Sequence, residues 1–177
     1  MRIIAGKYKG RTLLEFKGYD IRPTSDRARE SLFDILQLKV PGCVFLDLFC
    51  GTGAVGIEAL SRGAKKAVLN DVSRESVKIA KQNVAKLNNP EGITVTNFDA
   101  ETFVKSCGEE YDVIFLDPPY KSDAGLKTLN FIKNIIKDDG IVVFESEIPF
   151  DGEADGLTVY DSRRYGRACF TFFKKSV

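Results

Sequence analysis

The sequence contains no histidine, no C-x-x-C pair among its four cysteines, and no apolar run long enough to span a membrane. Without histidine the usual general base near neutral pH is missing, so proton transfer needs carboxylates, backbone groups or no base. The cysteine spacing is not that of zinc sites, and we expect no metal. With no membrane span and no apolar run near the N-terminus, we expect a soluble, cytoplasmic protein with no membrane partner.

Charge is distributed unevenly, although the net charge is only +1 over 177 residues. Residues 1–31 carry eight basic and four acidic side chains, and residues 163–177 carry five basic and no acidic ones. The middle, residues 32–162, carries 13 basic and 21 acidic side chains. Basic ends around an acidic middle favour a polyanionic partner that touches the ends of the chain.

Residues 1–38 are predicted to form a small extension made of a hairpin and a helix. Residues 2–5 and 11–16 read as short strands joined by a Gly-Lys-Tyr-Lys-Gly turn. A helix is expected to follow, through about residue 38, with Thr24 or Ser25 as its N-cap. The extension therefore ends where the pattern of the chain changes.

Residues 39–177 are predicted to form one domain in which strands alternate with helices. Apolar runs indicate strands over residues 44–48, 67–70, 93–95, 112–116 and 141–145. Helices are expected over residues 53–62, 73–87, 100–107 and 123–136, and a closing antiparallel pair over residues 157–162 and 168–173. This order is typical of an α/β fold with a doubly wound, mostly parallel sheet, which binds its ligands at the carboxyl ends of the strands.

A glycine-rich turn follows the first of these strands, in the segment DLFCGTGAVG, residues 47–56. Gly51 and Gly53 allow a tight turn that brings the backbone close to a ligand. Together with Gly56 they also fit the G-x-G-x-x-G pattern of dinucleotide-binding folds. Asp47 argues against that alternative, because a carboxylate would repel a pyrophosphate but suits a cofactor that carries an ammonium and a sulfonium group.

Two acidic residues further along are candidates for binding an adenosine group. Asp71 follows the second predicted strand, where an acid can accept hydrogen bonds from both ribose hydroxyls. Asp99 is expected to accept one from the adenine amine, while the backbone amide of Ala100 contacts the ring. Cys50 is expected to be a small packing residue rather than a nucleophile. The cofactor site is therefore assigned to Asp47, Phe49, Gly51, Thr52, Gly53, Asp71, Asp99 and Ala100.

A second motif, Asp117-Pro118-Pro119-Tyr120, ends an apolar strand. Two prolines cannot continue a central strand, so the chain is expected to leave the sheet here, beside the cofactor site. The Asp117 carboxylate and the Pro118 carbonyl can hold the two N–H groups of an exocyclic base amine, whose lone pair is delocalised into the ring. Tyr120 can stack on the base, which is worth about 1–3 kcal/mol. Methyl transfer to such an amine needs no strong base, in agreement with the missing histidine.

These motifs, with the opening RIIAG and the segment RPTSDRARESLF (residues 22–33), resemble the bacterial 16S ribosomal RNA guanine-N2 methyltransferases of the RsmD type. The resemblance covers nearly the whole chain and includes Glu145-Ser146-Glu147 and Tyr165-Gly166. It implies a class I S-adenosylmethionine-dependent methyltransferase (Rossmann-like) fold with a seven-stranded sheet, in which residues 39–177 are the catalytic domain. It also implies S-adenosylmethionine as cofactor and a guanine of 16S rRNA as acceptor.

The RNA implied by the resemblance would be either free rRNA or a small-subunit assembly intermediate, bound by a monomer. Its guanine amine must become accessible, so the enzyme is expected to flip the base or to take it from an unpaired site. Candidates for phosphate contacts are the basic residues of both ends, Arg2, Lys7, Lys9, Arg11, Arg22, Arg27, Arg29, Arg163 and Arg164.

Three other functions remain open. DNA adenine-N6 and cytosine-N4 methyltransferases share the Asp-Pro-Pro-Tyr motif, but usually need a separate target-recognition region for which 177 residues leave no room. Protein glutamine methyltransferases usually begin the corresponding motif with Asn. A non-catalytic RNA-binding module would not need Asp47, Gly51 and Asp117, which are all present.

Overall fold

Seven strands form the sheet at the centre of the computed structural model, which describes residues 1–17, 24–119 and 123–176. The strands are β1 (Val44–Asp47), β2 (Lys66–Asn70), β3 (Ile93–Thr96), β4 (Tyr111–Leu116), β5 (Ile136–Ser146), β6 (Leu157–Tyr165) and β7 (Ala168–Lys175). Their order in the sheet is β3-β2-β1-β4-β5-β7-β6. β1 to β5 run parallel, and β7 lies antiparallel between β5 and β6. The predicted seven-stranded, mostly parallel sheet is confirmed.

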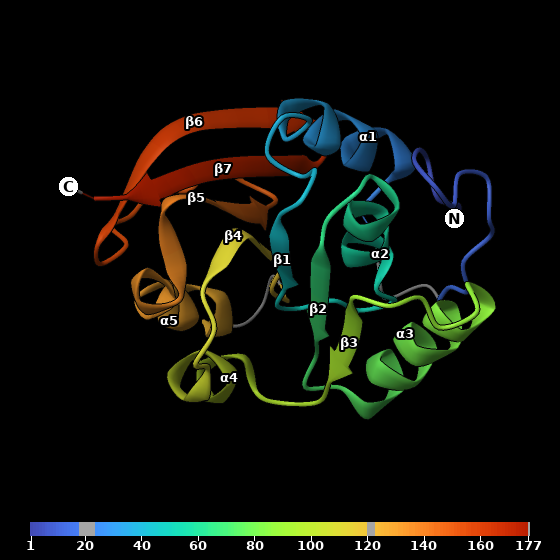
Figure 1. Cartoon of the computed structure of the whole chain (residues 1–177). Coiled ribbons are helices and arrows are strands. Elements are labelled where there is room, and N and C mark those ends of the chain that lie inside the picture. Colours follow the sequence, from blue (N-terminus) through green and yellow to red (C-terminus); the bar gives the residue numbers. More distant parts are fainter. Residues whose placement is uncertain (18–23, 120–122, 177) are drawn as a thin grey trace.

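Helices cover both faces of the sheet (Figure 1). One face carries α1 (Asp26–Ile35), α2 (Ala54–Ser61) and α3 (Arg74–Lys86), and the other carries α4 (Ala100–Ser106), α5 (Ala124–Leu129) and the 3-10 turn η1 (Ile132–Asn134). Alternation along β4 explains the two layers: Val113 and Phe115 pack with α1 and α2, whereas Ile114 and Leu116 pack with α4 and α5. The α/β class is therefore confirmed as well.

The first residues of the extension pack against α2 instead of forming a regular hairpin. An isolated bridge between Arg2 and Thr12 replaces the two strands that the sequence suggests. The backbone N–H groups of Ile4 and Ala5 donate to the Glu58 carboxylate of α2, at 2.8 and 3.0 Å. Because these two N–H groups donate to a side chain of α2, they are not available to pair with a second strand. The predicted strands are therefore reduced to a bridge.

Close contacts fix this attachment on two helices. Gly6 has a φ of +81°, and a Cβ added there would lie 1.8 Å from the carbonyl oxygen of Ser61 on α2. On α3, the Asn83 side-chain amide accepts the N–H of Leu14 at 2.7 Å and donates to the Leu14 carbonyl at 3.2 Å. The extension is thus fastened to α2 and α3 by specific contacts along its length.

Two helices are shorter than the sequence suggests. α1 ends one turn early, and the helix predicted over residues 123–136 is divided into α5 and η1. The division arises because Ile136 pairs with Tyr111 of β4 and so begins β5. Ile132, Ile135 and Ile136 have helical spacing, but all three are buried in the same cluster by a 3-10 turn followed by a strand.

Candidate functional site

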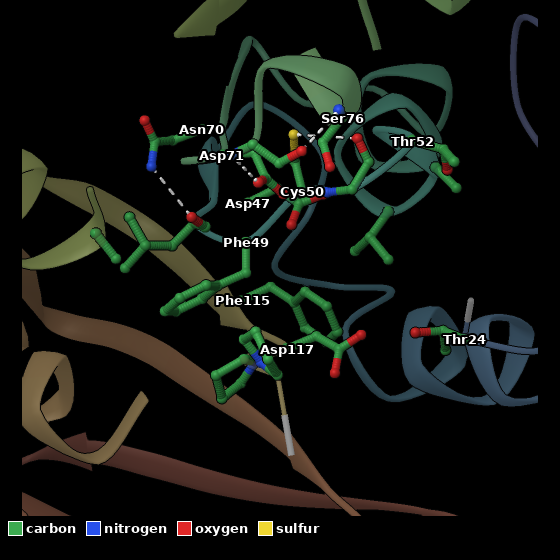
Figure 2. Close-up of a pocket in the computed structure, with 18 of the residues that line it drawn as sticks. Thr24, Asp47, Phe49, Cys50, Thr52, Asn70, Asp71, Ser76, Phe115 and Asp117 are labelled. Atoms are coloured by element: carbon green, nitrogen blue, oxygen red, sulfur yellow. Dashed lines mark hydrogen bonds between the residues drawn. The ribbon is translucent and has the colours of Figure 1, made fainter. Parts of the chain in front are cut away.

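A cavity of about 810 Å³ lies over the carboxyl ends of β1, β2 and β4. It brings the glycine-rich turn and the Asp-Pro-Pro segment together, although they are far apart in the sequence (Figure 2). Its lining includes most of the predicted site residues, namely Asp47, Phe49, Gly51, Thr52, Asp71, Asp99, Ala100, Asp117, Pro118 and Pro119. Gly53 is instead the N-cap of α2, and Tyr120 lies outside the described residues.

The glycine-rich turn leaves its backbone open toward the cavity at Gly51. Its φ is +51°, and the nearest atom to an added Cβ would be Cε2 of Phe16, at 3.7 Å. The Gly51 N–H donates to the Asp71 carboxylate at 2.9 Å, which ties the turn to the end of β2. Gly56 serves packing, because a Cβ there would lie 2.1 Å from Cδ2 of Leu69. One glycine of the motif therefore faces the cavity, and another lets α2 approach β2.

Asp47, the last residue of β1, is buried beneath the glycine-rich turn. Its Oδ2 accepts the backbone N–H of Gly56 at 3.0 Å. Burial raises the pKa of Asp47 to about 7; the hydrogen bond from Gly56 opposes this rise, and the charges of Asp71 and Glu145 add to it. The carboxyl group fastens β1 to the start of α2, and it also lines the cavity where a cationic group is expected.

Asp71 and its neighbour Asn70 organise the end of β2. Oδ1 of Asp71 accepts the N–H of Ser73 at 2.8 Å. Asn70 is buried, donates to the carbonyls of Leu48 and Phe98 at 3.2 and 3.0 Å, and accepts the Phe98 N–H at 3.1 Å. The sequence analysis did not identify Asn70, although a polar residue that closes a buried apolar strand was the available signal.

Asp99 is the N-cap of α4 and lines the cavity at the same time. Its carboxylate accepts the backbone N–H of Thr102 at 3.1 Å. Ala100, the first residue of α4, lines the cavity beside it. Phe49, within the glycine-rich segment, also lines the cavity (Figure 2). Polar and aromatic groups therefore lie together on this part of the cavity wall.

The Asp-Pro-Pro segment leaves the sheet at the end of β4, as two prolines require. α5 packs closely on it, since a Cβ at Gly125 would lie 2.3 Å from Cγ of Pro118. Asp117 faces the cavity (Figure 2). Burial raises the pKa of Asp117 well above its ordinary value, and the negative charges of Glu145 and Asp47 raise it further. The carboxyl group is thus placed where ionisation is difficult.

Glu145, near the end of β5, does not line the cavity, but its charge acts on Asp117, and the sequence analysis did not assign it. In the pairing of β4 with β5, Leu116 lies beside Phe144, so Asp117 and Glu145 follow at neighbouring positions. Glu145 is buried, which raises its pKa to about 7, and a 2.7 Å hydrogen bond from the Thr24 hydroxyl opposes the rise. An acid near the end of a buried apolar strand was the signal that could have identified it.

The basic candidates for RNA contacts are exposed, with one exception. The exposed residues are Arg2, Lys7, Lys9, Arg11, Arg27, Arg163 and Arg164, and Arg22 lies outside the described residues. Arg163 pairs with Asp161 at 2.9 Å. Arg164 donates to the carbonyl of Glu147 at 2.9 Å, and Glu147 lines the cavity. The end of β6 therefore carries positive charge to the rim of the cavity.

The assignment of Arg29 to RNA binding is wrong. Its side chain is fully buried, donates to the Arg2 carbonyl at 2.5 Å, and pairs with Asp26 at 3.0 Å. Its Nε lies 3.9 Å from the Glu58 carboxylate. On α1 this position shares the inward face with Leu32, so the helical period turns Arg29 away from solvent.

All four cysteines are free, and burial raises the pKa of Cys50 well above its ordinary value, which suits a packing role. In the described ranges, no three His, Cys, Asp or Glu side chains are grouped so that they could hold a metal ion. None of the described helices is both long and apolar enough to cross a membrane.

The strand order, with β7 antiparallel between β5 and β6, and the cavity above the glycine-rich turn define a class I methyltransferase fold. The solved structure of YhhF from Escherichia coli has the same fold, with a TM-score of 0.87 at 28% identity, over 99% of this chain and 97% of that one. The predicted fold is confirmed.

Sequence comparison places the chain in a family. The family described as Conserved hypothetical protein 95 matches residues 1–174. Ribosomal RNA small subunit methyltransferase D of Escherichia coli K12 is 34% identical over 150 residues, which are 84% of this chain and 75% of that protein. YlbH of Bacillus subtilis is 33% identical over 182 residues, 99% of either chain. The chain belongs to this RsmD-type family, as the resemblance predicted, and it is a methyltransferase.

Proposed function

We propose that this protein transfers a methyl group from S-adenosylmethionine to the exocyclic N2 amine of a guanine in 16S ribosomal RNA. The observation that carries the proposal is a single cavity whose wall holds both the glycine-rich turn and Asp117, because a methyl donor and an acceptor amine must meet in one place. The name of the Escherichia coli relative supports small-subunit rRNA as the acceptor.

The residues of the cavity fit S-adenosylmethionine. A volume of about 810 Å³ lies within the range of small-molecule sites, roughly 300–1,000 Å³. The open side of Gly51 admits a ligand where a side chain would intrude. Asp71 would accept the ribose hydroxyls, and Asp99 with Ala100 would bind the adenine. Asp47 would favour the positive charge of the cofactor, which, when bound, supplies a methyl group on a sulfonium centre.

The Asp-Pro-Pro-Tyr segment would hold the acceptor base. The Asp117 carboxyl group and the Pro118 carbonyl would accept the two N–H groups of the amine and so orient its lone pair toward the methyl group. Tyr120 would stack on the ring, a contact worth about 1–3 kcal/mol. The nitrogen becomes acidic once it is methylated, so its proton can leave without a histidine.

The extension, residues 1–38, would bind RNA together with the end of β6. α1 contacts β6 (Figure 1), so the helix that carries Arg27 lies beside the strand that carries Arg163 and Arg164. Such cations neutralise phosphates and position the RNA without reading its sequence. The proposal includes residues 39–177 as the catalytic domain, a cytoplasmic monomer, and rRNA or a small-subunit assembly intermediate as the substrate.

Methylation of small subunits and of bare 16S rRNA from cells that lack the enzyme tests the proposal. With S-adenosylmethionine present, nucleoside mass spectrometry should detect N2-methylguanosine. Methylated adenine or cytosine in DNA, or methylated glutamine in protein, would point to the alternative enzymes. RNA binding without thermal stabilisation by S-adenosylhomocysteine would indicate a non-catalytic module.

A further inference from the structure

Three carboxyl groups meet at one end of the sheet. Asp47, Asp117 and Glu145 stand at the ends of the neighbouring strands β1, β4 and β5. Asp47 and Asp117 line the cavity, as do the acidic or thiol side chains of Cys50, Asp71, Asp99 and Glu147, whereas Glu145 lies behind the lining. Carboxylates that are close together and poorly hydrated cannot all ionise unless cations oppose them, because each charge repels the next.

Among the described residues, no cation forms an ion pair with Asp47, Asp117 or Glu145. The cationic groups in that wall are the Arg29 guanidinium and the Met1 ammonium. Arg29 pairs with Asp26 and lies 3.9 Å from the Glu58 carboxylate, and the Met1 ammonium pairs with Glu15. The Nε and Nη1 atoms of Arg29 have no hydrogen-bond partner among the described residues, but its charge is directed to Asp26 and Glu58. The carboxyl cluster must therefore lower its charge by keeping protons.

Thr24 determines which member of the Asp117–Glu145 pair keeps its proton. The Thr24 hydroxyl donates to Oε2 of Glu145 at 2.7 Å, and a donor of this kind stabilises the charged form of a carboxyl group. Among residues 1–17, 24–119 and 123–176, none donates a hydrogen bond to the Asp117 carboxyl group. This hydrogen bond favours the negative charge on Glu145 and the proton on Asp117.

We propose that Asp117 presents a neutral carboxyl group to the guanine, and that Glu145, held by Thr24, is the positioning residue that keeps it neutral. This inference rests on the function proposed above. A neutral carboxyl group offers one donor and one acceptor, whereas a carboxylate only accepts. The N3 atom and the N2–H group of guanine offer an acceptor and a donor side by side, so both oxygens of Asp117 bind the base.

The same pair takes up the proton that methylation releases. The amine nitrogen forms a bond to the methyl carbon as the carbon–sulfur bond breaks, with the bonding electrons left on sulfur. The nitrogen is then positively charged, carries two hydrogens and loses one of them. Asp117 and Glu145 together hold one proton and one negative charge, so they accept this proton, become neutral, and later pass it to water.

Single-turnover methylation of the RNA, measured against pH with saturating S-adenosylmethionine, tests the inference. The wild-type rate should fall as rising pH removes the Asp117 proton. Asp117→Asn keeps one donor and one acceptor, so its rate should stay within about tenfold of the wild-type rate. Because an amide does not titrate, this rate should no longer decrease as pH rises. Asp117→Ala keeps neither and should lose about 10²–10³-fold.

Two variants that leave Asp117 in place test the role of its neighbours. Glu145→Gln removes the adjacent charge, and Thr24→Val removes the hydroxyl that holds this charge on Glu145. In both variants Asp117 should ionise more easily, so the fall in rate should move to lower pH. Glu91→Gln, an exposed position before β3 at the opposite end of the sheet, should leave the profile unchanged. Binding of S-adenosylhomocysteine checks that each variant is folded.

The inference is overturned if the wild-type rate rises with pH through a carboxyl titration and Asp117→Asn is as inactive as Asp117→Ala. It is also overturned if folded Glu145→Gln keeps the wild-type pH profile. If Glu145→Gln does not fold, Thr24→Val provides the test by itself, and a wild-type pH profile in this variant would overturn the inference. A wild-type enzyme that methylates no guanine amine would overturn the proposed function instead.

Discussion

The two halves of the cavity hold their acidic side chains in different ways. In the cofactor half, at the ends of β1 and β2, Asp47 and Asp71 each accept a backbone N–H from the glycine-rich segment. In the acceptor half, at the ends of β4 and β5, the Glu145 carboxyl group accepts a hydrogen bond from the side-chain hydroxyl of Thr24. Among the described residues, no backbone N–H donates a hydrogen bond to the carboxyl group of Asp117 or of Glu145.

Because of this difference, we expect the residues that bind the cofactor and the residues that act on the acceptor base to respond differently to substitution. Backbone donors come with the fold, so the cofactor half is complete as soon as the glycine-rich segment has formed. The acceptor half depends on one hydroxyl from the extension, 121 residues away from Glu145 in the sequence. Changes in the two halves should therefore have different effects, and four measurements examine this.

The largest effect is expected from Asp117→Ala. This change should lower the rate of methyl transfer by at least about 10²–10³-fold, because the amine loses a contact that strengthens during the reaction. The affinity for S-adenosylhomocysteine, measured by calorimetry, should be almost unchanged, since the cofactor half is intact. A fully active Asp117→Ala enzyme would refute the assignment of the acceptor half.

The next effect concerns stability and pH. Glu145 has a pKa of about 7 in the folded protein, whereas a free Glu lies near 4. The folded state therefore retains the proton longer, and this favourable contribution is complete below pH 4 and lost as pH rises through 7. Glu145→Gln has no such titration. At pH 8 it should be more stable than wild type, by up to roughly 3 kcal/mol, and at pH 4 it should have no such advantage.

Urea unfolding of the ligand-free protein at several pH values measures this difference. Glu91→Gln is the control, because Glu91 is exposed and its removal should leave the pH dependence as in wild type. Parallel stability curves for wild type and Glu145→Gln would show that Glu145 ionises as freely in the folded protein as in the unfolded chain.

A matched pair of glycine substitutions sharpens the description of the cofactor half. Gly56→Ala places a methyl group 2.1 Å from Cδ2 of Leu69, and such overpacking should reduce stability by about 1–3 kcal/mol. Gly51→Ala meets no atom closer than 3.7 Å, so only its positive φ is unfavourable, by about 1–2 kcal/mol. Its methyl group faces the cavity, and cofactor affinity should fall.

Thermal melting and calorimetry separate the two glycine variants. Gly51→Ala should lose more cofactor affinity, and Gly56→Ala more stability. The opposite ranking would mean that the turn contacts the cofactor through Gly56 rather than Gly51.

The smallest effect is expected on the RNA surface. Arg163→Glu with Arg164→Glu should weaken RNA binding and reduce its salt dependence, by a slope of about 0.7–0.9 for each lost phosphate contact. Lys65→Glu is the control, because Lys65 is exposed just before β2, at the end of the sheet opposite the cavity. Equal salt slopes in all three proteins would remove the end of β6 from the RNA site.

Much of the sheet could be predicted from the sequence because each part leaves a local pattern. Apolar runs mark the strands, and the residues that close them, Asp47 and Asp117, belong to one edge once the strands are parallel. The cavity follows from that topology without any knowledge of side-chain packing. Gly51 was identified for the same reason, since its role is a property of the backbone turn.

The contacts of the extension could not be predicted, because they depend on which surface it meets. Arginine is a residue type that usually lies on the exposed face of a helix, yet Arg29 is buried near Glu58 of α2. The hydrogen bond from Thr24 to Glu145 likewise joins distant parts of the chain. The residue pattern of one segment does not indicate which distant segment it will contact. This is why the acceptor half was only partly identified from the sequence.

The position of β7 inside the sheet has a consequence for synthesis of the protein. β7 leaves the ribosome after β5 and β6, but it lies between them in the sheet, and β6 is at the edge. Until β7 emerges, β5 presents an open flank and β6 has no place in the sheet. Open strand edges invite pairing with other chains. A chain cut short before Ala168 would therefore leave β5 as an unpaired edge strand. We expect such fragments to aggregate rather than to persist as partly active enzymes.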